Sequence, residues 1–124
     1  MLTIPVSVRI FLYTEPTDMR KSFDALANLI TEHLGQDPLS GHLFVFINRR
    51  RDRLKLLYFE RGGYALWYKR LEEGSFQSLT SASEQTSNNG VEITAADFSM
   101  LLEGIDLSKA KRRKRYTKPE SSSA

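Results

Sequence analysis

With 124 residues, the chain is long enough to bury one hydrophobic core and too short to form two independent domains. Hydrophobic residues make up 40% and charged residues 27%, which is typical of a folded domain and excludes a chain that is disordered throughout. Cysteine is absent, so the sequence offers no disulfide, no thiolate nucleophile and no cysteine-ligated zinc site.

The first apolar run, residues 4–13, is interrupted by Pro5 and Arg9 and is not followed by a cleavage site of small residues, so it does not fit a signal peptide. No stretch approaches the roughly 20 apolar residues that a membrane span needs. We therefore expect a cytoplasmic protein with no membrane partner.

The net charge of +3 is distributed unevenly along the chain. Residues 1–48 carry a net charge of −2 and residues 71–108 a net charge of −7, whereas residues 49–70 and 109–124 each carry +6. Two basic blocks therefore flank an acidic one.

Strand and helix signals follow each other at the start of the chain. Residues 6–13 alternate and contain β-branched and aromatic side chains, which predicts a strand. Thr17 or Asp18 can cap a helix whose apolar residues recur at spacings of three and four as far as Leu34, and Gly35 supplies its stop. This helix has one apolar face and must therefore pack on another element, most simply a sheet.

The strands of that sheet are predicted from three short apolar runs at residues 43–47, 53–59 and 64–71. Their connections, residues 48–52 and 60–63, are short enough to force antiparallel hairpins. A three-stranded meander follows, and strands at residues 6–13 and 91–93 would bring the sheet to five.

Alternation along the second and third runs predicts the two faces of the meander. One face carries Arg53, Lys55, Leu57, Phe59, Tyr64, Leu66, Tyr68 and Arg70. The other face carries Leu54, Leu56, Tyr58, Ala65, Trp67 and Lys69. If the first turn has five residues, Phe44 and Phe46 join this second face, and we expect the amphipathic helix to pack there, over Trp67.

Polar residues dominate the segment 76–90, which we interpret as a mobile connection. Thr94 opens a capping-box pattern before a short second helix that ends near Gly104. Residues 109–124 cannot bury their charge and are predicted to form a disordered basic tail. The predicted fold is thus one α+β domain at residues 1–108: a small antiparallel sheet, a meander of three to five strands, with one amphipathic helix packed on it and a second short helix near its C-terminus.

No pattern for catalysis emerges from the sequence. Metal-dependent strand transfer needs converging carboxylates, but the acidic residues lie mostly beside basic residues or in polar segments. The two histidines, His33 and His42, lack a second histidine two or four residues away for metal binding, and no serine lies in a nucleophile elbow. We therefore expect a protein that is not an enzyme and needs no metal or cofactor.

Clustered basic residues are the strongest functional signal, because guanidinium groups bind phosphate oxygens through paired hydrogen bonds. The predicted nucleic-acid-binding residues of the hairpin are Arg49, Arg50, Arg51, Arg53, Lys55, Lys69 and Arg70. Those of the tail are Lys111, Arg112, Arg113, Lys114 and Arg115, followed by Tyr116 as a stacking side chain. The alternatives are a solvated turn that pairs with the acidic segment 71–108, and a tail that only solubilises the protein.

The aromatic residues Tyr64, Trp67 and Tyr68 allow two interpretations. They could form a stacking platform for single-stranded nucleic acid, or they could belong to the core of the domain, as aromatic residues on strands usually do.

Three segments carry a resemblance to a known family. They are DMRKSFDALANLI at residues 18–30, LFVFINRRRDRLKLLYFERGGYALWYKRLEEGSF at residues 43–76 and LLEGIDL at residues 101–107. Together they resemble the TnpB-type accessory proteins encoded by the second reading frame of insertion sequences of the group numbered sixty-six. Ala25 and Gly62 are small departures from the family's usual glycine and aspartate. The resemblance implies participation in DNA transposition beside a separate, larger transposase that carries the catalytic acids, and it supplies no site residues.

Two functions are compatible with these observations. The first is an accessory factor in transposition that binds DNA through the hairpin and the tail, with DNA and the transposase of the same element as partners. The second is a protein adaptor that docks the transposase through the mixed sheet face and the acidic segment without touching DNA. A nuclease or recombinase is disfavoured because it needs residues that the sequence lacks.

Overall fold

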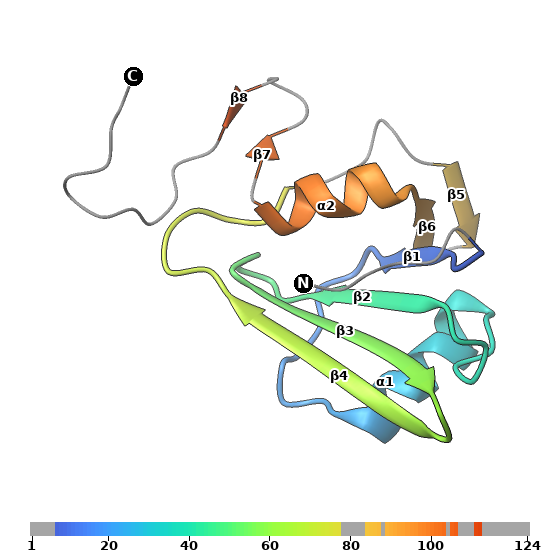
Figure 1. The fold of residues 1–124 in the computed structure, drawn as a ribbon. Coiled ribbons are helices and arrows are strands. Elements are labelled where there is room, and N and C mark those ends of the chain that lie inside the picture. Colours follow the sequence, from blue (N-terminus) through green and yellow to red (C-terminus); the bar gives the residue numbers. More distant parts are fainter. Residues whose placement is uncertain (1–6, 78–83, 88, 104, 107–110, 113–124) are drawn as a thin grey trace.

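The computed structural model describes residues 7–77, 84–87, 89–103, 105–106 and 111–112. Its main elements are β1 (Ile10–Tyr13), α1 (Phe23–Leu29), the π-helical turn η1 (Ile30–Leu34), β2 (Leu43–Ile47), β3 (Arg53–Glu60), β4 (Gly63–Arg70), β5 (Glu84–Ser87), β6 (Gly90–Ile93) and α2 (Ala95–Glu103). Strands β1 to β6 form one sheet, and Figure 1 shows α1 and α2 on opposite sides of it. The α+β class predicted from the sequence is confirmed.

The sheet has the strand order β4-β3-β2-β1-β6-β5. The meander β2-β3-β4 is antiparallel, as predicted, whereas β1 lies parallel to β2. Parallel neighbours need a long crossover connection, and α1 provides it. The sheet is therefore mixed, and β5 brings it to six strands where three to five were predicted.

The two turns of the meander set its register. Arg61 and Gly62 form the second turn with φ of 51° and 84°, the two positive values that a tight two-residue hairpin turn needs, and the predicted faces of β3 and β4 are confirmed. In the first turn, the Asn48 N–H donates to the Arg53 carbonyl oxygen at 3.1 Å. That turn therefore holds the four residues 49–52, not the five that were predicted.

This register places Phe44 and Phe46 on the sheet face that carries Lys55 and Leu57. The prediction that both phenylalanines share the face of Trp67 is wrong, because a slip of one residue moves every side chain of a strand to the other face.

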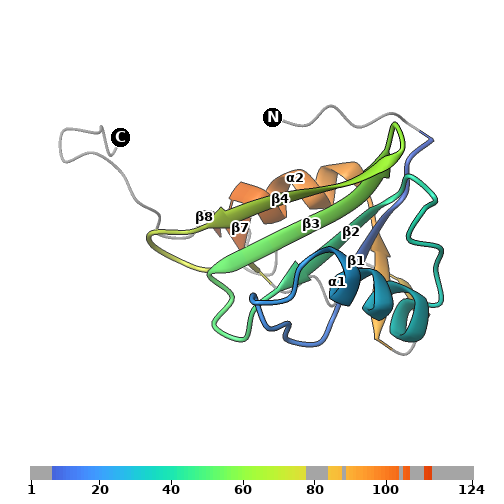
Figure 2. The ribbon, with the colours of Figure 1, turned by 90° about the horizontal axis from the view of Figure 1, so that it is seen from below.

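Each helix covers one core. The core under α1 consists of Phe11, Tyr13, Leu26, Ile30, Leu34, Phe44, Phe46 and Leu57. The core under α2 consists of Ile10, Leu12, Leu43, Val45, Ile47, Leu54, Leu56, Phe76, Val91, Ile93, Phe98, Leu101 and Leu102, and Trp67 packs against it. The prediction that the first helix lies over Trp67 is therefore wrong, because α1 packs on the phenylalanines of β2. Figure 2 shows α1 and α2 on opposite sides of the sheet.

Helix α1 begins at Phe23, well after the predicted cap at Thr17 or Asp18. Residues 17–21 instead form a loop that is tied to the end of β2, because the Thr17 N–H donates to the Ile47 carbonyl oxygen at 2.9 Å. The loop consequently lies next to the basic turn that follows β2.

Two other predicted helix ends are confirmed. Gly35 ends the first helical segment with a φ of 64°, a left-handed conformation that glycine adopts without strain. The Thr94 hydroxyl accepts a hydrogen bond from the Asp97 N–H at 3.0 Å and so caps α2.

The predicted connection and tail lie partly outside the described residues. Within residues 76–90, Phe76 is buried and β5 pairs with β6. Within the tail, the structure describes the two-residue strand β8 (Lys111–Arg112), which pairs with β7 (Ile105–Asp106). The mobility of the connection, the disorder of the tail and the domain boundary stay predictions. Among the described helices, none has the length and apolarity needed to cross a membrane.

Candidate nucleic-acid interface

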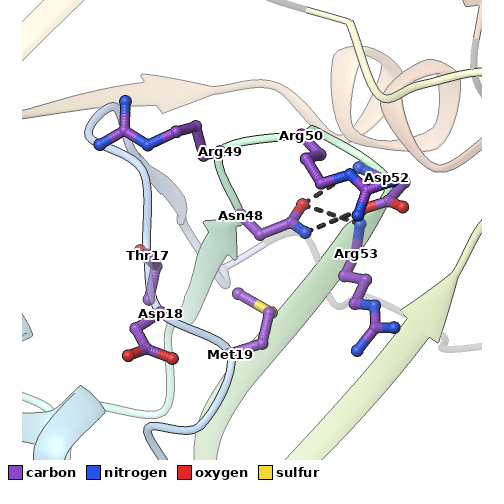
Figure 3. A pocket seen from close by; sticks show the side chains of 8 residues that line it. All are labelled: Thr17, Asp18, Met19, Asn48, Arg49, Arg50, Asp52 and Arg53. Carbon is purple, nitrogen blue, oxygen red and sulfur yellow. Dashed lines mark hydrogen bonds between the residues drawn. The ribbon is translucent and has the colours of Figure 1, made fainter.

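The basic turn, residues 49–52, is fixed by the side chain of Asn48. Its Oδ1 accepts hydrogen bonds from the backbone N–H groups of Asp52 and Arg53, both at 3.0 Å, and its Nδ2 donates to the Asp52 carboxylate at 2.8 Å (Figure 3). Asparagine side chains commonly close turns in this way. The backbone that carries the arginines is therefore held in a defined conformation.

An open hollow of about 420 Å³ lies between the basic turn and the loop 17–21. It is lined by Thr17, Asp18, Met19, Asn48, Arg49, Arg50, Asp52 and Arg53 (Figure 3). Three guanidinium groups and two carboxylates thus border one surface feature.

Both carboxylates of the hollow already have hydrogen-bond partners. The Asp18 carboxylate accepts bonds from the Arg20 side chain at 2.7 to 3.1 Å and from the Arg20 N–H at 2.9 Å, which lowers the pKa of Asp18 to about 2. The hydrogen bond from Asn48 lowers the pKa of Asp52 below its ordinary value. Both carboxylates are therefore hydrogen-bonded by groups other than Arg49 and Arg50.

The contact with Arg20 predicts a measurable pH effect. The folded pKa of Asp18, about 2, lies below the ordinary value of 3.8, so ionised Asp18 stabilises the fold above about pH 4 and this contribution is lost as the pH falls through 2. We expect Arg20→Ala to return the Asp18 pKa toward 3.8 in a carboxyl-carbon NMR titration, whereas Lys21→Ala, which removes a weaker Coulombic influence, changes it little. A pKa that stays near 2 in Arg20→Ala would contradict this assignment.

Four arginines gather positive charge at this end of the sheet. Arg49 and Arg50 are exposed, and neither forms an ion pair within the described part of the chain. Arg53 is partly exposed and lies directly opposite Arg70 in the β3-β4 ladder, while Arg70 pairs with Glu72 at 3.0 Å. The predicted residues Arg49, Arg50, Arg53 and Arg70 are thus accessible to a ligand.

Two predicted lysines point into the protein. Lys55 is only 6% exposed, and its Nζ donates to the carbonyl oxygens of Met19 and Lys21, both at 2.7 Å. Lys69 lies on the opposite face of the sheet, and its Nζ donates to the Leu102 carbonyl oxygen at 3.0 Å, near the C-terminus of α2. A cation at that terminus also matches the helix dipole. Both lysines therefore connect elements of the fold.

The Arg51 side chain also binds backbone carbonyl groups. Its Nε donates to the Phe76 carbonyl oxygen at 2.7 Å and its terminal nitrogen to the Gln77 carbonyl oxygen at 2.6 Å, while the Phe76 N–H donates back to the Arg51 carbonyl oxygen at 2.7 Å. Burial lowers the pKa of the Arg51 guanidinium. Arg51 therefore fastens the segment after β4 to the basic turn.

Comparison with known proteins identifies the family of the chain. Residues 8–112 match the family described as IS66 Orf2 like protein. The chain belongs to this family. The uncharacterized proteins y4jC and y4hO of Sinorhizobium fredii (strain NBRC 101917 / NGR234) are 34% and 37% identical to the IS66 Orf2-like chain. The alignments cover 90% of the chain and 92% of y4jC, and 86% of the chain and 88% of y4hO. No solved structure gives a significant match.

Family membership gives this IS66 Orf2-like protein an accessory role in transposition and confirms the resemblance inferred from the sequence. The matched span includes the basic turn and the hollow. The matched span ends with Lys111 and Arg112, whose backbone forms strand β8. The other predicted tail residues, Arg113, Lys114 and Arg115, lie outside the described residues.

Sequence reasoning missed one wall of the hollow. It assigned residues 17–21 of the IS66 Orf2-like chain to the start of a helix, and so did not place them beside the arginines. Asn48, directly before the basic run, was an available signal for a closed turn. Within the described residues, no group of three His, Asp or Glu side chains could hold a metal ion.

Proposed function

We propose that this IS66 Orf2-like protein is a non-catalytic accessory factor that binds DNA through its basic turn and tail. The observation that supports this function is the set of three arginines, Arg49, Arg50 and Arg53, which border an open hollow and form no ion pair among the described residues. A guanidinium group that forms no ion pair can bind two oxygens of a phosphate through two parallel hydrogen bonds. Such a surface suits the DNA backbone.

The expected contacts are with phosphates, so binding should depend little on sequence. Arg70 extends the surface along β4, and residues 109–124 add seven basic residues against a single acidic one. Arg51, Lys55 and Lys69 are left out of the proposed interface because their side chains bind backbone carbonyl groups.

The salt dependence of DNA affinity tests the proposal. Each neutralised phosphate releases counterions, so log affinity falls with log salt by about 0.9 per contact on duplex DNA. We expect joint replacement of Arg49, Arg50 and Arg53 by alanine to make this slope shallower by about one to three units, equally for unrelated sequences. Removal of residues 109–124 should make it shallower by several further units.

Arg61→Asn is a single-charge control for the arginine variant, which removes three charges. Arg61 is exposed in the other turn of the meander and has a φ of 51°, which asparagine tolerates, so the change removes a charge without touching the hollow. The slope of log affinity against log salt for Arg61→Asn should equal that of the unaltered protein. If the unaltered protein shows no salt-sensitive binding to duplex or single-stranded DNA at about 50 mM salt, the proposed function is wrong.

A second candidate function, a protein adaptor for the transposase, is favoured by a different observation. Strand β4 is an edge of the sheet in the described structure, and its eight residues leave one row of backbone groups without a neighbouring strand. An extended segment of a partner can add to such an edge. Capture of the transposase of the same element that survives nuclease treatment would favour the adaptor, whereas capture that nuclease abolishes would favour bridging by DNA.

A further inference from the structure

The three aromatic residues of β4 have different surroundings. Tyr64 packs edge-on against Phe59 with ring centroids 5.4 Å apart, and Trp67 packs against the core under α2. Tyr68 is 48% exposed and lies on the other face of the sheet from Trp67, opposite Lys55. Of the three side chains, Tyr68 alone combines wide exposure with a place on the arginine-bearing face.

The ring of Tyr68 is held from two directions. The Lys55 Nζ lies 5.0 Å from the ring centroid, and because Lys55 is only 6% exposed, it supports the ring from the protein side. Arg53 donates to the Tyr68 hydroxyl at 3.4 Å. The exposed part of the ring is therefore the side that faces away from Lys55.

Two arginines of like charge form the next cross-strand pair on the same face as this ring. Arg53 and Arg70 are directly opposite each other in the antiparallel β3-β4 pair, an arrangement that destabilises a sheet. The pair between Arg70 and Glu72 is more than half exposed at both side chains and so compensates little. A phosphate placed between Arg53 and Arg70 would relieve their repulsion.

We propose that Tyr68 stacks on a base of an unpaired DNA segment while Arg53 and Arg70 bind the adjoining phosphates. This inference rests on the proposed function and specifies the form of DNA that the site takes. A base within a duplex is covered on both sides by its neighbours, whereas an unpaired base can present its face to an aromatic ring. Stacking accepts every base, so the segment is bound without sequence preference.

Paired titrations of a single strand of about 15 nucleotides and of its duplex test this inference, with fluorescence anisotropy as the readout. Tyr68→Leu keeps an apolar cover over Lys55 but removes the ring. We expect it to weaken single-strand binding about five- to 100-fold and to leave duplex binding within about twofold. Tyr68→Phe keeps the ring and should bind the single strand nearly as well as the unaltered protein.

A DNA single strand with 2-aminopurine at its centre reports stacking directly, because the fluorescence of 2-aminopurine falls when this base stacks on a ring. Quenching by the unaltered protein and by Tyr68→Phe, but not by Tyr68→Leu, would support the inference. Equal single-strand affinity and equal quenching for Tyr68→Leu would overturn it while the salt-dependent binding, and with it the proposed function, stands. Absence of binding to either DNA form by the unaltered protein would overturn both.

Discussion

Replacement of Lys55 by alanine is expected to lower the free energy of unfolding by about 3 kcal/mol. The Lys55 Nζ donates two hydrogen bonds of 2.7 Å to the carbonyl oxygens of Met19 and Lys21 in a nearly buried position. Each hydrogen bond from a charged donor contributes about 1.5 to 3 kcal/mol, and the two carbonyl groups lose their partner in the variant. Urea unfolding measures the loss as a lower midpoint at constant slope.

Two companion variants separate this role from a loss of charge. Lys55→Met keeps most of the alkyl chain and removes the ammonium group, so it should lose nearly as much stability as Lys55→Ala. Arg49→Ala removes the same charge from an exposed side chain and should stay within about 0.5 kcal/mol of the unaltered protein. A Lys55→Ala variant as stable as Arg49→Ala would show that the contacts to the loop 17–21 are not structural.

The meander could be predicted because its turns and apolar runs mark its strands. The predicted run 43–47 is β2, and the turn at Arg61 and Gly62 sets the register of the following pair. The first turn has no glycine or proline to fix its length: Asn48 indicates a turn, but three consecutive arginines follow it, and Arg51 itself takes a φ of 61°. The register there depends on backbone bonds at Asn48, and one residue of difference exchanged the two faces of β2.

The neighbours of β1 could not be predicted from local pattern. This strand pairs in parallel with β2 and antiparallel with β6, and an ion pair of 2.7 Å joins Arg9 to Glu92 beside the second pairing. A strand buried on both faces has the same composition whichever strands lie beside it. Its partners follow from the packing of the whole domain.

Charge identified a basic surface but did not assign a role to each residue. Lys55, Lys69 and Arg51 all donate to carbonyl groups from distant parts of the chain, and nothing in a local sequence run indicates where those carbonyl groups lie. Arg49 and Arg50, which precede Arg51 directly, are exposed. Adjacent arginines of one run can thus have different roles.

Substitutions of Phe76 and Arg51 are expected to show that difference. Phe76 is fully buried in the core under α2, so Phe76→Ala should lower the free energy of unfolding by about 3 to 5 kcal/mol. Arg51→Ala removes two short hydrogen bonds to the carbonyl oxygens of Phe76 and Gln77 and should cost about 2 to 4 kcal/mol. Arg50→Ala, next to it in the sequence, should change stability by less than about 0.5 kcal/mol.

Comparison of Arg51→Gly with Arg51→Ala separates side chain from backbone at this position. Glycine adopts the positive φ of Arg51 more easily than alanine, so the Arg51→Gly variant should be more stable than Arg51→Ala by about 1 kcal/mol and still less stable than the unaltered protein.

Arg51 holds the segment that contains the buried Phe76. The double variant Arg51→Ala, Phe76→Ala should therefore lose less free energy of unfolding than the sum of the two single losses, with a coupling of about 1 to 2 kcal/mol. Strictly additive losses in urea unfolding would mean that Phe76 is buried without help from Arg51. The basic turn would then carry Arg51 for a reason other than anchoring the segment after β4.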